Sequence, residues 1–107
     1  MSFDIETVLK DMASAAAESS SDRTNEIKQY AKTILENEKN SLKELGQARI
    51  KKEISEEVFD REVEREKKVV ETELLAIEIM TKAMAQKAVN AAIDVFTKAV
   101  KAAIPTI

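Results

Sequence analysis

No glycine or proline interrupts the second half of this 107-residue chain between Ser55 and Ile104. The chain has one glycine, Gly46, and one proline, Pro105. Its many Ala, Glu, Lys and Leu residues are strong helix formers. An unbroken helix of that span would be about 75 Å long at 1.5 Å per residue. A compact domain of this size has a radius of gyration of only about 13 Å. We therefore expect an elongated all-α protein with a single helical domain over residues 1–107.

The pattern of caps and apolar residues predicts three helices, at about residues 2–18, 22–52 and 55–104, the last about 50 residues long. Ser2 and Ser55 are expected N-caps, and Ser21 or Asp22 is expected to cap the second helix. Pro105 is expected to end the third helix.

The second and third predicted helices are expected to pair as a long antiparallel hairpin. Residues 22–54 carry eight basic and six acidic side chains, whereas residues 55–73 carry eight acidic and four basic ones. This opposite charge on either side of the turn favours the pairing. The first helix either continues in line with the second or folds back to make a bundle, and the sequence is compatible with both arrangements. Gly46 either ends a helix early or lies inside one, at a cost of about 1 kcal/mol.

From Leu74 onward the third helix is apolar around most of its circumference, a pattern typical of a helix that is buried on several sides. One neighbouring helix does not cover such a wide face, so the sequence predicts a homo-oligomer, with a dimer as first choice, in which hairpins form a helical bundle. The expected oligomer interface is Leu74, Ile77, Met84, Ala88, Ala92, Val95, Phe96, Ala99 and Ala103.

A lipid surface is the alternative partner for residues 74–104. The segment 87–93 recurs, with one polar exchange, as 98–104, an 11-residue offset that keeps one helix face on a flat interface. Lysines beside an apolar face suit such peripheral binding to a membrane. The same lysines interrupt the segment too often for a transmembrane helix.

The predicted hairpin tip is rich in charge and is a candidate site for an unidentified protein partner. Its residues are Arg49, Lys51, Lys52, Glu56 and Glu57. Acidic residues lie directly beside the basic ones, and the net charge of the chain is −3. Nucleic acid is therefore an unlikely partner, since such binders present clustered basic surface.

The composition argues against an enzyme. The chain has neither Cys nor His, which excludes thiol nucleophiles and imidazole bases, and a single glycine excludes a Gly-rich phosphate loop. We predict no catalytic residue, no cofactor and no metal ligand. The remote alternative is a carboxylate metal site that uses glutamates such as Glu38, Glu62, Glu66 and Glu73.

The absence of Cys fits a reducing compartment, and the first residues do not combine a basic run with an apolar one. A cytoplasmic location is expected. The function that best fits these patterns is that of a non-enzymatic structural or protein-interaction module, which self-associates through its Ala-rich C-terminal helix and exposes the charged tip.

Overall fold

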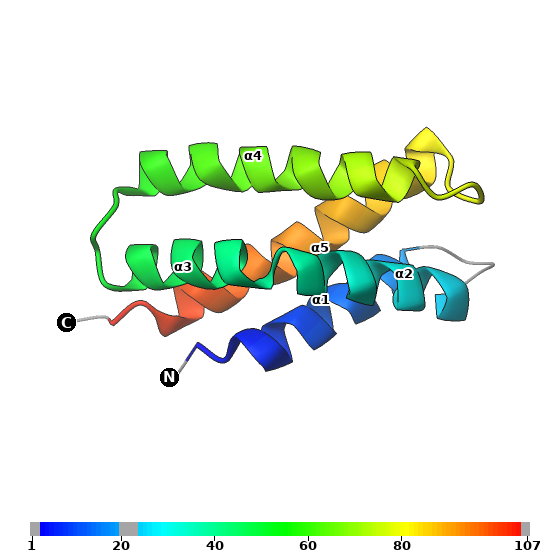
Figure 1. Cartoon of the computed structure of the whole chain (residues 1–107). Coiled ribbons are helices and arrows are strands. Elements are labelled where there is room, and N and C mark those ends of the chain that lie inside the picture. Colours follow the sequence, from blue (N-terminus) through cyan, green and yellow to red (C-terminus); the bar gives the residue numbers. More distant parts are fainter. Residues whose placement is uncertain (1–2, 20–23, 106–107) are drawn as a thin grey trace.

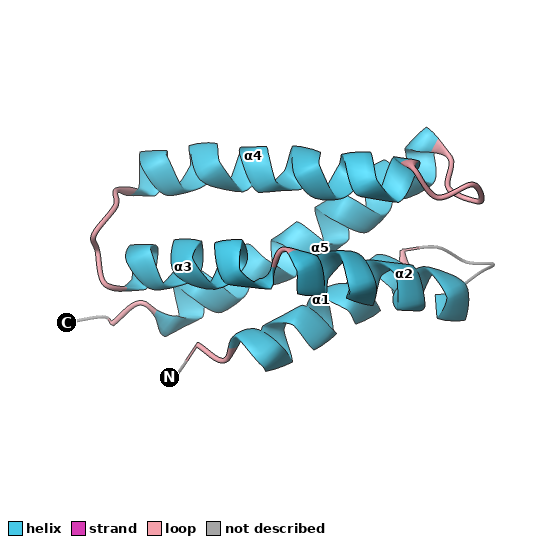
Figure 2. Ribbon diagram, in the orientation of Figure 1, coloured by secondary structure: helices cyan, strands magenta, loops and turns pink. Residues whose placement is uncertain are grey.

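A computed structural model of the chain describes residues 3–19 and 24–105. Within these ranges the structure is all-helical and contains no strand (Figures 1 and 2). The helices are α1 (Ile5–Glu18), α2 (Thr24–Asn37), α3 (Lys39–Ile50), α4 (Glu56–Leu75) and α5 (Lys82–Ala103).

The described helices form a bundle of rods that alternate in direction, with α2 and α3 together making one kinked rod (Figure 1). The kink is one residue long. The N–H of Glu38 donates to the carbonyl of Leu35 at 3.1 Å, and the Glu38 carbonyl accepts from Leu42 N at 3.0 Å. The single helix predicted over residues 22–52 is therefore present as two helices with nearly continuous hydrogen bonding.

The first helix folds back, which settles the alternative that the sequence left open. α1 packs most extensively on α5 and on α2, and α4 packs on α5, α2 and α3. The radius of gyration is 13.6 Å, and the molecule measures 45 × 23 × 19 Å. The elongated shape expected from the sequence is therefore wrong, because the chain reverses direction more often than predicted.

The predicted 50-residue helix is also wrong. It divides into α4 and α5, which are joined by a turn at residues 76–81. Thr81 caps α5, since its hydroxyl accepts from Met84 N at 3.1 Å. A straight helix would leave much of the apolar C-terminal half in water, whereas the reversal packs it against α1 and α4. Met80, in the turn itself, is buried.

Several predicted helix ends are confirmed. Ser55 caps α4 by accepting from Val58 N at 3.2 Å. α5 ends at Ala103, and Ile104 is extended, as the residue before a proline favours. The first helix begins later than expected, because Asp4 is its N-cap and accepts from Glu6 N at 3.1 Å. The caps predicted at Ser2, Ser21 and Asp22 lie outside the described residues.

Lys52 shapes the turn between α3 and α4. It adopts φ 61°, in the left-handed region, after Lys51 has capped α3. The N–H of Glu53 donates to Ala48 O at 2.8 Å, and that of Lys52 donates to Arg49 O at 3.0 Å. This is a Schellman motif, a helix ending in which glycine is the usual left-handed residue.

The core runs along the bundle and contains most of the apolar side chains of α1 and α5. Several alanines of α1 and α5 are buried, and these two helices make the most extensive helix contact of the fold, because small side chains let two helices approach closely. Its largest fully buried side chains are Met12, Ile27, Leu35, Leu42, Leu74, Val89, Phe96 and Val100.

Candidate functional site

The residues expected at an oligomer interface lie in or against the core of a single chain. Leu74, Ala88, Ala92, Phe96 and Ala103 are buried. The remaining four are partly buried and pack against the same core: Ile77, Met84, Val95 and Ala99. The wide apolar face of the C-terminal segment is therefore covered within the chain, chiefly by α1 and α4.

The packing of α5 also shows which side of the segment predicted to bind lipid is exposed. The exposed side of α5 is polar and includes Lys82, Lys87 and Asp94, whereas its apolar side faces the other helices. Among the described residues, no helix combines the length and apolarity needed to span a membrane.

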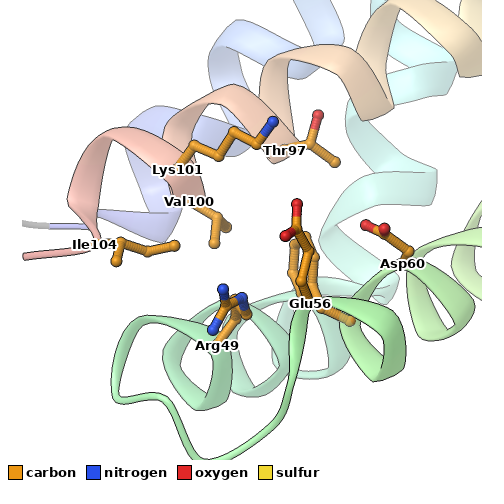
Figure 3. Close-up of a pocket in the computed structure, with 8 residues that line it drawn as sticks. Arg49, Glu56, Asp60, Thr97, Val100, Lys101 and Ile104 are labelled. Atoms are coloured by element: carbon orange, nitrogen blue, oxygen red, sulfur yellow. The ribbon is translucent and has the colours of Figure 1, made fainter.

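The charged tip adjoins the C-terminal end of α5. Arg49, from the last turn of α3, and Glu56, from the first turn of α4, line a pocket of about 440 Å³ (Figure 3). Lys51, Lys52 and Glu57 are exposed and are not among its lining residues. The described residues that line it are Arg49, Glu56, Phe59, Asp60, Thr97, Val100, Lys101 and Ile104.

The pocket has an apolar base and a charged rim. Phe59 and Val100 are buried, and the Phe59 ring stacks on Phe96 with centroids 6.1 Å apart. Glu56 and Asp60 project from α4, and Lys101 projects from α5 on the opposite side (Figure 3). This combination suits a ligand that has both an apolar group and charges.

The rim charges do not neutralise one another. Within the described part of the chain, Arg49, Glu56, Asp60 and Lys101 form no ion pair. Arg49 is held in place by a hydrogen bond in which its Nη1 donates to Ile54 O at 3.4 Å. The acidic and basic groups are therefore available to pair with opposite charges on a ligand.

One hydroxyl lies among the described residues that line the pocket. It belongs to Thr97 and donates to Asp94 O at 3.1 Å. Sequence reasoning identified Arg49 and Glu56 but missed the six other described residues of the lining. The signal for them is weak, because residues 97–104 reach the tip only through the reversal at residues 76–81.

The glutamates considered as metal ligands do lie near one another. Partial burial, followed by the charge of nearby Glu38, raises the pKa of Glu66 from 4.5 to about 7. A hydrogen bond to Glu38 and the charges of Glu62 and Glu73 act in the same direction. Nevertheless, in residues 3–19 and 24–105 no group of three or more acidic side chains is arranged to hold a metal ion.

Comparison with known proteins finds no relative. The chain matches no family model, no curated protein and no solved structure.

Proposed function

We propose that this protein is a non-catalytic interaction module that captures a segment of another protein in the pocket between α3, α4 and α5. The observation that carries the proposal is the pocket of about 440 Å³, in which a buried apolar base is framed by charges of both signs. Its volume lies in the range of about 300–1,000 Å³ that is typical of ligand sites.

The mixed charge of the rim favours a polypeptide over a polyanion. Two basic side chains, Arg49 and Lys101, and two acidic ones, Glu56 and Asp60, line the pocket. Nucleic acid would repel the acidic pair, since its affinity comes mainly from phosphate contacts. A peptide can place an apolar side chain on Phe59 and Val100. An acidic and a basic residue beside that side chain then pair with the basic and the acidic groups of the rim.

Self-association through α5 stays a prediction, and the packing gives it less support than the sequence did. The side chains expected at the dimer contact are already in or against the core of one chain. We therefore propose that a single folded chain is the binding unit.

Selection from a displayed peptide library tests the proposal. Peptides selected on the wild-type protein are expected to lose at least about tenfold in affinity with Thr97→Phe, which fills the pocket, and with Lys101→Glu, which reverses a rim charge. Lys87→Glu is the matched control, because Lys87 is exposed on the same helix and is not a lining residue of the pocket.

Circular dichroism establishes that each variant is folded, and fluorescence anisotropy gives the affinities. The proposal fails if no peptide is enriched over the support alone, or if the pocket variants and the control bind the selected peptides equally well.

A further inference from the structure

We propose that the groove between α3 and α4 is a second binding surface, which accepts a basic amphipathic helix from a partner protein. It lies on another side of α4 from the pocket in Figure 3, and none of the described residues lines both. The inference therefore goes beyond the proposed function and does not rest on it.

The groove is long enough for a helix and has an apolar strip. Its volume is about 400 Å³, and α3 and α4 run antiparallel along it, joined by the turn (Figure 1). Leu45, Ala48, Ile54 and Val58 supply partly buried apolar surface. Ser41 to Ala48 covers two helical turns, about 10 Å of helix axis. An amphipathic helix presents apolar residues at that spacing when it lies in a groove.

A single apolar side chain lies along α4 beyond the groove, among acidic residues. Val69 is 38% exposed, one of the few large apolar side chains that the fold leaves in water. Residues at i, i+4, i+7 and i+11 share a helix face, so Glu62, Glu66, Val69 and Glu73 lie along one side of α4. A docked helix that follows this side extends the contact from the groove toward α2.

The charge of the groove selects a basic partner. Glu44, Glu62 and Glu66 line it, and Arg65 is the one basic residue among the described residues of the lining. Arg65 Nη1 lies 3.4 Å from Glu62 Oε2, and its side chain is 74% exposed, so it balances only part of the negative charge. Beyond the groove, Glu38 and Glu73 add further negative charge near Glu66.

Two of these carboxyl groups are incompletely hydrogen-bonded. Glu66 has a side-chain hydrogen bond to Glu38, but Oε2 of Glu66 and Oε2 of Glu73 are shielded from solvent and have no hydrogen-bond partner among the described residues. A shielded carboxylate oxygen without a donor is unfavourable. Lysine or arginine side chains on a docked helix supply positive charge close to these groups. A second copy of this chain fits less well, because the basic side of α5 carries few apolar residues.

The probe is a synthetic 18-residue helix with leucines at i, i+3, i+4 and i+7 and lysines on both flanks of that stripe. A second peptide has the same composition in an order that abolishes the stripe. We expect the wild-type protein to bind the amphipathic peptide at least about tenfold more tightly than the reordered one, because only the former matches the apolar strip.

The variant Glu62→Gln/Glu66→Gln is expected to weaken this binding by about tenfold at pH 7.5. Glu57→Gln/Glu64→Gln is the matched control: it removes the same charge from the same helix, outside the groove, and should change the affinity less than about twofold. Ala48→Trp, which fills the groove without removing a core side chain, should weaken binding while preserving the helical circular dichroism spectrum.

The proposal is overturned if the two peptides bind equally, if both glutamine pairs weaken binding equally, or if the amphipathic peptide does not bind. A stable dimer in the absence of peptide that Ala48→Trp dissociates would assign the groove to a second copy and also overturns it. Thr97→Phe and Lys101→Glu should leave binding of this peptide unchanged, which separates a failure here from a failure of the pocket proposal.

Discussion

The ring of Phe3 occupies the space where a side chain at residue 46 would begin. A Cβ placed on Gly46 would lie 2.6 Å from Cζ of Phe3 and 3.3 Å from Cγ2 of Val100. Gly46 is buried inside α3, where glycine is otherwise unfavourable. The only glycine in the chain therefore permits a close contact between the segment before α1 and the middle of α3.

Two opposing effects should make the consequence of Gly46→Ala depend on Phe3. Alanine favours the helix by about 1 kcal/mol, but its methyl group displaces the Phe3 ring. We expect Gly46→Ala to leave stability unchanged or lower it by about 1 kcal/mol in the wild type, and to raise it by about 1 kcal/mol in a Phe3→Ala background. Urea unfolding of the four proteins measures this cycle. Equal effects in both backgrounds would contradict the contact.

Lys52 should be replaceable by glycine with a gain in stability. Its φ of 61° is costly for a residue with a Cβ and costs glycine little. We expect Lys52→Gly to raise the free energy of unfolding by about 0.5–1 kcal/mol. Lys51→Gly removes the same charge from a right-handed position and should lower it instead. Thermal unfolding of both variants is the measurement, and a change of the same sign in both would count against the assigned turn.

The carboxyl of Glu66 should make the protein less stable at alkaline pH. Its pKa of about 7 in the folded protein exceeds the ordinary 4.5, so the folded chain binds more protons between these values. Its contribution therefore favours folding at low pH and is lost as the pH rises through about 7. Allowing for solvent screening, we expect Glu66→Gln to raise the free energy of unfolding by about 1 kcal/mol at pH 8.

That gain should shrink toward zero near pH 4.5, where Glu66 is increasingly neutral in both states. Glu57→Gln, on an exposed side of α4, controls for the loss of one negative charge. Urea unfolding at pH 4.5, 6 and 8 makes the comparison. A gain that is independent of pH would show that the neighbouring carboxylates do not act on Glu66.

Substitution of Phe96 tests whether this residue belongs to the core of one chain or to an interface between chains. Its ring is fully buried and lies between Phe3, with centroids 6.2 Å apart, and Phe59. We expect Phe96→Ala to lower the free energy of unfolding by about 3–5 kcal/mol, whereas Tyr30→Ala, at an exposed site, should change it by about 0.5 kcal/mol or less.

Light scattering coupled to size exclusion completes this test. We expect the wild-type mass to be that of one chain, 11.9 kDa, at every concentration. The opposite outcome is a wild-type mass that is a fixed multiple of this value, together with a Phe96→Ala variant that is folded and has the mass of one chain. That outcome would support the dimer interface predicted from the sequence.

Helix ends such as those of α4 and α5 can be predicted from the sequence because they depend on neighbouring residues. Ser55 with two acidic residues after it predicts the start of α4, and Pro105 predicts the end of α5. The break at residues 76–81 is different, because no glycine or proline marks it. Thr81 is an adequate cap, but the same residue type occurs inside helices elsewhere in this chain, as at Thr33 and Thr72.

The residues of the candidate site likewise fall into those that the sequence predicts and those that only the fold brings together. Arg49 and Glu56 flank a predictable turn, and their charge alone identifies them as candidates. Phe59, Thr97 and Lys101 belong to the pocket only because α5 returns to the α3–α4 end of the bundle. Likewise, Glu38 acts on Glu66 only because α2 and α3 lie beside α4.

Short-range patterns in the sequence specify that the chain is helical, where α4 begins, where α5 ends and that charged residues flank the turn between α3 and α4. These properties follow from propensity, capping and spacing over a few residues. The number of chain reversals and the surfaces that stay exposed depend instead on long-range packing. The C-terminal apolar face is buried by α1 and α4 within one chain once the predicted long helix breaks.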